Sequence, residues 1–269
     1  MKKLILPKSL SLLRNHAILR FLFSLLVMVM LSVSVGWGQI AAWDFFGESS
    51  PANSPADVYN LNLDASNLIT RGSGASASSA SNSFRTQGFQ NNGISTSNND
   101  YFQITISAKS GYKVSLSSID ARFAGTSTFY ATPGVTSQFA YSLDGTNFTL
   151  IGSPLQSTSL TLSQINLTGI SALQNVSSGT TITLRYYASG QTTTGGWGFN
   201  STYAGQYGLA IGGSVIADVN LPSLTTPISS TITTTTAILG ATVTSDGGGT
   251  LSARGTVYGT SANPIGNEL

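Results

Sequence analysis

The segment that decides the fold reads Phe139-Ala-Tyr-Ser-Leu-Asp-Gly-Thr-Asn-Phe148. From Phe139 to Leu143, apolar side chains alternate with small or polar ones, and a period of two is typical of a strand with one buried face. Asp144-Gly145 follows this strand. An Asp-Gly pair between two strands favours a tight two-residue turn in which both residues take positive φ. The segment therefore predicts an antiparallel β-hairpin.

The same alternation recurs in the rest of the chain. Apolar side chains share one face in three further runs, at residues 102–106, 182–186 and 209–211. The chain of 269 residues contains 41 Ser, 32 Thr and 29 Gly, and Thr favours strands whereas Gly and Ser favour turns. Many short strands separated by turns predict an all-β protein, a sandwich or a barrel.

Two segments stand out from this strand pattern. Residues 72–83, GSGASASSASNS, have low complexity and predict a long flexible loop. Residues 167–176 contain the one plausible helical turn, in which Ile170 and Leu173 are three residues apart and could plug one end of a sandwich.

The first 38 residues have the pattern of an export signal. Residues 2–20 carry five basic side chains and no acidic one, and residues 21–35 are apolar apart from three serines. Gly36-Trp37-Gly38 places small residues at −3 and −1 of a cut before Gln39. This order predicts a secretory signal peptide over residues 1–38. The alternative is an uncleaved anchor, but the apolar run is shorter than the roughly 20 residues that span a bilayer.

Removal of that signal changes the charge of the chain. The whole sequence has a formal charge of +2, but without residues 1–38 seven basic residues face ten acidic ones, a net charge of −3. A basic surface for nucleic acid is therefore not expected. The chain has no Cys, and its single His, His16, lies in the signal. We therefore expect neither a Ser-His-Asp or Cys-His nucleophile nor a usual zinc site.

The mature chain divides into two unequal parts. A change of composition between two prolines predicts a first domain over residues 39–217 and a linker over residues 218–223. Residues 224–269 contain a Thr-rich predicted strand at 233–244 and another at 252–258. Two or three strands do not bury a core of their own, so we expect residues 224–269 to be part of an incomplete domain.

This C-terminal part resembles a known kind of repeat. The segment Ile232-Thr-Thr-Thr-Thr-Ala-Ile-Leu-Gly-Ala-Thr-Val-Thr-Ser-Asp246, followed by Ala253-Arg-Gly-Thr-Val-Tyr-Gly-Thr-Ser261, is similar to the opening of fibronectin type III-like repeats in large exported bacterial surface proteins. The resemblance implies a truncated immunoglobulin/fibronectin-like β domain over residues 224–269.

The first part resembles the N-terminal jelly-roll modules of such proteins. The similar features are Ala42-Trp-Asp-Phe45 after the signal, the hairpin segment at residues 141–148, Trp197-Gly-Phe199, and a last strand at residues 207–215. The resemblance implies a jelly-roll-like β-sandwich, with adhesion, glycan binding or a spacer role in a secreted or cell-surface protein. Such proteins often carry a C-terminal sorting domain, and none is found in this sequence.

The aromatic residues near the predicted last strand are the first candidates for a binding site. Trp197, Phe199 and Tyr203 lie in the Gly-rich stretch 195–207. Sugars stack their apolar face on aromatic rings, and glycines on both sides would let the ring of Trp197 stand exposed on a loop. The alternative is that Trp197 or Phe199 covers the core where the last strand begins.

Two arginines complete the predicted ligand-binding set. Arg122 and Arg185 lie beside apolar residues in strand-like runs. Each could present a guanidinium group on an open sheet face, where it would donate hydrogen bonds to a ligand. The alternative for both is an ordinary solvated surface charge.

Carboxylates supply the remaining chemistry. A glycosidase needs two carboxyl groups about 5–10 Å apart, and four residues are candidates, namely Asp44, Asp100, Asp120 and Asp144. A structural calcium ion would need an oxygen cage, for which the candidates are Asp44, Glu48, Asp57 and Asp64. Solvated loop acids are the alternative. We expect no catalytic residue and no cofactor, and leave the metal open.

These observations lead to one functional hypothesis with two alternatives. We expect a non-enzymatic adhesion or binding module, secreted or on the bacterial cell surface, that contacts an extracellular glycan or matrix. We expect no nucleic-acid partner and no membrane span in the mature chain. The alternatives are a carbohydrate-binding accessory module of a larger polysaccharide-active enzyme, and a glycosidase-like enzyme.

Overall fold

The structure is a computed structural model that describes residues 38–64, 67–219, 222–248 and residue 255. Within these residues the regular elements are β-strands and a single short 3₁₀ turn, which confirms the prediction of an all-β protein. The predicted signal peptide, apart from Gly38, and almost all of the predicted strand at 252–258 lie outside the described residues. No helix in the described part is long and apolar enough to cross a membrane.

The first of two main sheets has six strands. The central strands are β7 and β16, which are antiparallel over nine residue pairs, with a bulge between Gly212 and Gly213. In spatial order, the path is β12 (Ile165–Asn166), β7 (Tyr112–Ala121), β16 (Leu209–Ala217), β1 (Gln39–Trp43) and β3 (Val58–Tyr59), with β13 (Val176–Ser177) also paired to β7. We call this the six-stranded sheet.

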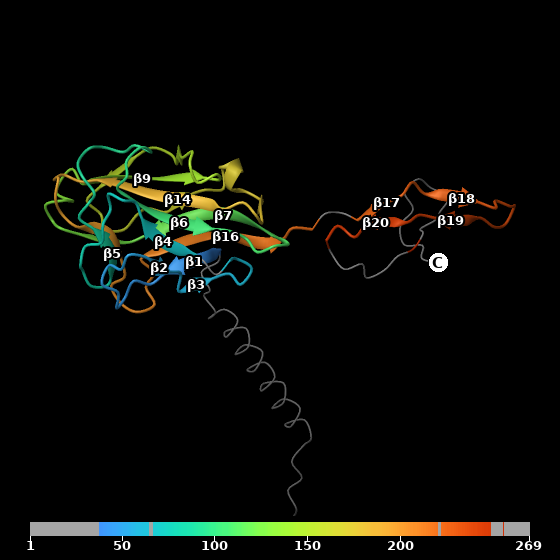
Figure 1. The fold of residues 1–269 in the computed structure, drawn as a ribbon, viewed down its shortest axis with the longest axis horizontal. Coiled ribbons are helices and arrows are strands. Elements are labelled where there is room, and N and C mark those ends of the chain that lie inside the picture. The colour runs from blue at the N-terminus through green and yellow to red at the C-terminus, as the bar shows by residue number, and fades with distance from the viewer. Residues whose placement is uncertain (1–37, 65–66, 220–221, 249–254, 256–269) are drawn as a thin grey trace, which may run out of the picture. The chain divides into compact units, whose positions relative to one another are not determined.

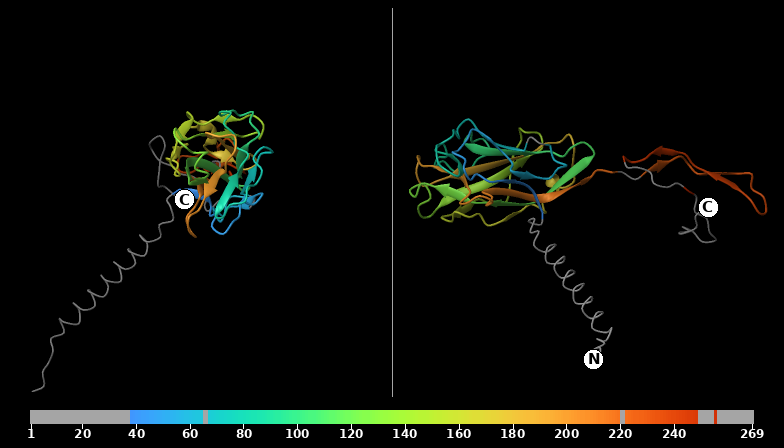
Figure 2. Two further views of the ribbon diagram at one scale, coloured as in Figure 1. Left: turned by 90° about the vertical axis from the view of Figure 1, so that its left-hand side faces the viewer. Right: turned by 90° about the horizontal axis from the view of Figure 1, so that it is seen from below.

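The second main sheet has seven strands and lies face to face with the first (Figure 1; Figure 2). In spatial order, it contains β10 (Thr149–Leu150), β9 (Val135–Ser142), β14 (Ile182–Ser189), β6 (Tyr101–Ile106), β4 (Leu68–Arg71) and β2 (Ser54–Pro55), with β11 (Leu155–Ser157) also paired to β9. Strands β6 and β7 follow each other in sequence but belong to different sheets. The strands of these two sheets therefore form a β-sandwich.

A third, smaller sheet lies at one end of the sandwich. It consists of β5 (Ser83–Thr86), β15 (Trp197–Asn200) and β8 (Phe123–Gly125); β5 is at the left of Figure 1. The aromatic core gathers under this sheet, with rings in mutual contact from Phe45, Phe84, Phe89, Phe102, Phe123, Phe139, Tyr186, Trp197 and Phe199. Tilted and edge-to-face aromatic pairs add to the gain from burial.

The alternating patterns are confirmed along the core strands. Strand β6 alternates half-buried and buried residues along its whole length, with Phe102, Ile104 and Ile106 inside. In β14, Ile182, Leu184 and Tyr186 are buried as expected. The outward side chains of β9 and β14 are also largely covered, because the loops at 90–100 and 143–153 lie over them, as the hydrogen bonds from Gly93 and Gln138 show.

The hairpin at residues 139–148 forms, but not with the predicted turn. Strands β9 and β10 pair with Tyr141 opposite Thr149, so the connection is a longer loop than two residues. Gly145 has a φ of +73°, whereas Asp144 is not in the positive-φ region. The side chain of Asp144 instead accepts hydrogen bonds from the backbone N–H groups of Thr146 and Asn147. These side-chain bonds stabilise the wider loop.

The two exceptional segments also have defined structures. The 3₁₀ turn at Ser171–Leu173 places Leu173 in the core, as expected, and leaves Ile170 half-buried against it. The predicted loop at 72–83 lies on the surface of the sandwich rather than projecting from it. Ala75 within that loop is fully buried, and the N–H of Gly74 donates to the carbonyl oxygen of Asn99.

The described part of the C-terminal region contains only short strands. Strand β17 (Ser223–Leu224) pairs with β20 (Val243–Ser245), and β18 (Ile228–Ser230) pairs with β19 (Ile238–Gly240). The predicted continuous strand at 233–244 is wrong, because Thr233–Thr236 form a turn closed by the Thr233 hydroxyl. The boundaries of the domains remain predictions.

Candidate functional site

The structure places the predicted aromatic platform inside the protein. Trp197 and Phe199 lie on β15 with 2% and 0% of their surface exposed, so the prediction that Trp197 stands exposed on a loop is wrong. The alternative, that these residues cover the core, describes what is found. The neighbouring glycines serve strand packing: a Cβ at Gly198 would clash with the backbone of Phe84 on β5.

The remaining predicted residues are not brought together. Tyr203 is exposed in the loop between β15 and β16, and Arg122 is exposed at the junction of β7 and β8. Arg185 and Tyr186 are successive residues of β14 and therefore point to opposite faces of the sheet. Tyr186 packs in the aromatic core, and Arg185 lies half-buried on the outer face. The five predicted residues do not form one site.

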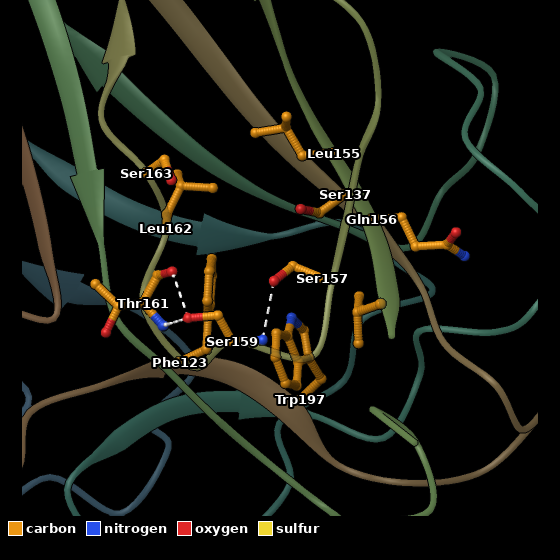
Figure 3. A pocket seen from close by; sticks show the side chains of 11 residues that line it. Phe123, Ser137, Leu155, Gln156, Ser157, Ser159, Thr161, Leu162, Ser163 and Trp197 are labelled. Carbon is orange, nitrogen blue, oxygen red and sulfur yellow. Dashed lines mark hydrogen bonds between the residues drawn. The ribbon is translucent and has the colours of Figure 1, made fainter. Parts of the chain in front are cut away.

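A cavity of about 270 Å³ lies beside the buried tryptophan (Figure 3). Phe123 and Trp197 form its aromatic side, and Val135, Leu155 and Leu162 add apolar surface. Its other lining residues carry hydroxyl or amide groups, and they are Ser137, Gln156, Ser157, Ser159, Thr161 and Ser163. An apolar wall with converging uncharged polar groups is typical of a small-molecule or sugar site.

A second cavity, of about 360 Å³, adjoins the first. The two share Ser137, Leu155, Leu162 and Ser163. The second is the more apolar, since Phe139, Ile151, Ile165 and Ile170 line it, and its polar groups include Gln138, Gln164 and Asn166. Strand β11 on one side belongs to the seven-stranded sheet and β12 on the other to the six-stranded sheet. We call the two cavities together the edge groove.

Hydrogen bonds order the loop that forms one wall of the edge groove. The N–H of Ser159 donates to Ser157 Oγ at 2.9 Å. Ser159 Oγ accepts from the N–H of Thr161 at 3.1 Å and donates to the carbonyl oxygen of Thr161 at 2.9 Å. These bonds are drawn as dashed lines in Figure 3. The wall is therefore held in place by its own side chains, which reduces the entropy lost when a ligand binds.

Among the described residues, none that lines either cavity of the edge groove is acidic. The candidate carboxylates instead have other partners: Asp120 accepts from Gln164 Nε2, and Asp44 accepts from the N–H groups of Phe46 and Gly205. Asp100 is 5% exposed, and burial raises its pKa. The structure thus brings no pair of carboxylates together in this groove.

The predicted calcium ligands are only partly neighbours. Burial raises the pKa of Glu48, and the charges of Asp57 and Asp44 raise it further, so these three carboxylates lie near one another. Asp64 lies elsewhere and accepts from Ser107 Oγ at 2.7 Å. Within residues 38–64, 67–219 and 222–248, no group of three or more acidic or histidine side chains is placed to hold a metal ion.

Sequence reasoning missed the loop wall of the edge groove. The segment Ser157-Thr-Ser-Leu-Thr-Leu-Ser163 carries a hydroxyl at every second position, and these four side chains all line the first cavity. That alternation is the pattern that could have indicated the site. Its partner wall on β9 could not be found in the same way, because pairing between β9 and β11 brings the two together.

The comparisons with known proteins add no relative. No protein-family model matches the chain, and a search of the curated proteins finds no similar sequence. The likeness to surface modules and fibronectin-like repeats therefore remains an expectation from the sequence.

Proposed function

We propose that this protein is a non-enzymatic glycan-binding module of a secreted or cell-surface bacterial protein, and that the edge groove is its binding site. The observation that supports this proposal is the lining of the first cavity, which combines the largely buried rings of Phe123 and Trp197 with uncharged hydroxyl and amide groups. A pyranose has apolar C–H faces and a hydroxyl edge, and such a lining is complementary to both.

The chemistry of the groove favours binding over hydrolysis. A glycosidase of the common kind needs two carboxyl groups at the scissile bond, and in the described part of the chain no acidic side chain lines either cavity. The alternative of a carbohydrate-binding accessory module would use the same groove. It differs only in that a catalytic domain would be present elsewhere in the full protein. A binding test therefore bears on both of these hypotheses.

A blocking substitution tests the groove. Ser163 is exposed and lines both cavities, so Ser163→Trp should fill the groove without disturbing the core. Thr158 is an exposed residue of the same wall that lines neither cavity, and Thr158→Trp is the matched control. Affinity electrophoresis against a panel of neutral polysaccharides should show retarded migration of the wild type and of T158W, and normal migration of S163W.

Three results would overturn this proposal. Migration of the wild type unchanged across the whole panel would remove glycan binding, and equal retardation of S163W and the wild type would remove the groove. Release of new reducing ends from a retained polysaccharide would show that the protein is an enzyme.

Export is the second part of the proposal and has its own test. The predicted signal peptide places the mature N-terminus at Gln39. Expression of the full sequence in a bacterial host, followed by N-terminal sequencing of the exported fraction, should give Gln39 as the first residue. A protein retained in the cytoplasm with its N-terminal segment intact would overturn the proposed location.

A further inference from the structure

The outer face of the seven-stranded sheet carries an arginine held between two aromatic rings. The Cζ atom of Arg185 on β14 lies 3.8 Å from the ring centroid of Tyr101 and 3.7 Å from that of Phe148. Tyr101 is on the neighbouring strand β6, and Phe148 is in the loop that follows β9 on the other side. The Nε–H of Arg185 donates to Gln103 Oε1 at 2.9 Å. These contacts hold the plane and the direction of the guanidinium group.

The charge of Arg185 is not neutralised by a neighbour in the described part of the chain. The ion pair found there joins Lys113 on β7 to Asp218, the residue after β16. The phenol of Tyr187 has a pKa raised mainly by burial, although a hydrogen bond with Arg185 lowers it, so this partner of Arg185 stays neutral. Asp144, in the same loop as Phe148, is engaged with Ser142, Thr146 and Asn147.

Arg71 provides an internal comparison. Its guanidinium is also stacked on a ring, 3.7 Å from the centroid of Phe84. Its N–H groups, however, are taken by the carbonyl oxygens of Pro51, Ala75 and Arg85. A guanidinium group has five N–H donors. In Arg71, these donors are already engaged with carbonyl oxygens of the protein. Arg185 has the same stacking without such a set of backbone acceptors.

We propose that Arg185 anchors a second binding site, which takes an anionic group of a polysaccharide, either the carboxylate of a uronic acid or a sulfate ester. The two outer N–H groups of a guanidinium fit the two oxygens of such a group in a bidentate pair. The side chains beside Arg185 on this face are rings, amides and hydroxyls (Tyr101, Gln103, Thr105 and Thr183), which match the C–H faces and hydroxyls of a sugar chain better than a peptide.

This site is independent of the edge groove. Arg185, Tyr101 and Phe148 line neither of its cavities. Among the described residues, no charged side chain lines the edge groove, whereas the proposed site has Arg185. Neutral glycans therefore test the edge groove, and acidic glycans test the site at Arg185. Failure of one proposal leaves the other standing.

Affinity electrophoresis against four polymers tests the inference: polygalacturonate, dextran sulfate, neutral dextran and polyglutamate. The wild type should be retarded by polygalacturonate or by dextran sulfate. Retardation by polygalacturonate would assign a carboxylate to the site, and retardation by dextran sulfate would assign a sulfate ester. Arg185→Gln should weaken that binding roughly tenfold or more, because a charge-assisted bidentate pair is lost. Lys109→Gln removes one exposed positive charge elsewhere and should change the affinity by no more than about twofold.

A conservative variant guards against a folding defect in R185Q. Arg185→Lys keeps the charge but loses the planar fork, so it should remain folded by circular dichroism and still bind the acidic polymer several-fold more weakly than the wild type. The S163W variant, blocked in the edge groove, should bind the acidic polymer as the wild type does.

Several results would overturn the inference. They are binding of R185Q or R185K equal to that of the wild type, an equal loss in K109Q, no retardation by either acidic polysaccharide, and retardation by polyglutamate as strong as by polygalacturonate. The last result would assign the site to an acidic peptide.

Discussion

The indole nitrogen of Trp197 donates a hydrogen bond to the hydroxyl oxygen of Tyr186 at 2.9 Å, and both side chains are buried. The bond joins β15 of the small sheet to β14 of the seven-stranded sheet, at the side of the edge groove. Because a buried N–H without an acceptor is costly, this pair ties the small sheet to the sandwich.

Tyr186→Phe should therefore destabilise the protein. The change leaves Trp197 Nε1 without its acceptor, which costs about 1–3 kcal/mol of unfolding free energy. Urea unfolding measures this loss. In the double variant with Trp197→Phe, the two costs should not add, because both remove the same bond; full additivity would contradict the argument.

Arg71 should be a structural residue rather than a binding one. Burial lowers the pKa of its guanidinium to about 10, and its donors serve three carbonyl oxygens. Arg71→Met keeps the apolar contact with Phe84 but leaves those oxygens unpaired, so we expect a loss of about 2–3 kcal/mol in urea unfolding. Polysaccharide binding by the folded variant should be unchanged. A variant as stable as the wild type would show that water replaces the guanidinium.

Asp144 should make the hairpin loop sensitive to acid. Hydrogen bonds from the Asn147 side chain and from the N–H groups of Asn147 and Thr146 hold the pKa of its carboxyl well below the usual range. A lowered pKa stabilises the fold at pH values above the ordinary 3.8 and less as the pH falls below it. Asp144→Asn should lower the melting temperature at pH 7.

The difference between D144N and the wild type should then narrow as the pH is lowered from 4 to 2. Thermal unfolding followed by circular dichroism over this range gives the comparison. A difference that stays constant down to pH 2 would mean that the charge of Asp144 is not the cause.

Asp100 should behave in the opposite sense. Its Oδ2 atom is buried without a hydrogen-bond partner in the described structure, and burial raises the pKa of its carboxyl. A raised pKa favours the protonated form in the folded protein, so stability is greatest below the ordinary 3.8 and falls as the pH rises through the folded value. Asp100→Asn removes the ionisable carboxyl group and with it this loss of stability at higher pH.

The stability of D100N relative to the wild type should therefore increase between pH 3 and pH 7. The same thermal unfolding series measures it, with D144N as the variant expected to move the other way. A D100N protein whose relative stability falls over this interval would show that the ionised carboxyl is favourable in the fold.

The sequence carried most of the information about the strands. Residues 102–106 and 182–186 alternate apolar and polar side chains, and a period of two has one physical cause, a sheet with a buried face. The hairpin at 139–148 was predicted as an element, but its turn was not. The Asp-Gly pair allowed a tight turn, and the carboxyl of Asp144 stabilised a wider one through hydrogen bonds to three following donors.

The candidate sites were less accessible from the sequence. Trp197 was wrongly expected to stand exposed on a loop; it is buried and lines a cavity that the sequence did not predict. The glycines around it were read as freeing the ring, whereas Gly198 allows β15 to approach the backbone of β5. Arg185 was found as a candidate, but its two aromatic partners are 84 and 37 residues away in the chain.

By itself, the sequence indicated the core strands at 102–106 and 182–186 and the faces that they bury, and it showed the pattern of an export signal at residues 1–38. These properties depend on the composition and the alternation of residues that are close together in the sequence, so they can be read without knowledge of tertiary contacts. Only the tertiary structure decided what lies in the edge groove and beside Arg185. Both places are made by strands that are distant in sequence and adjacent through sheet pairing, and no local pattern records that register.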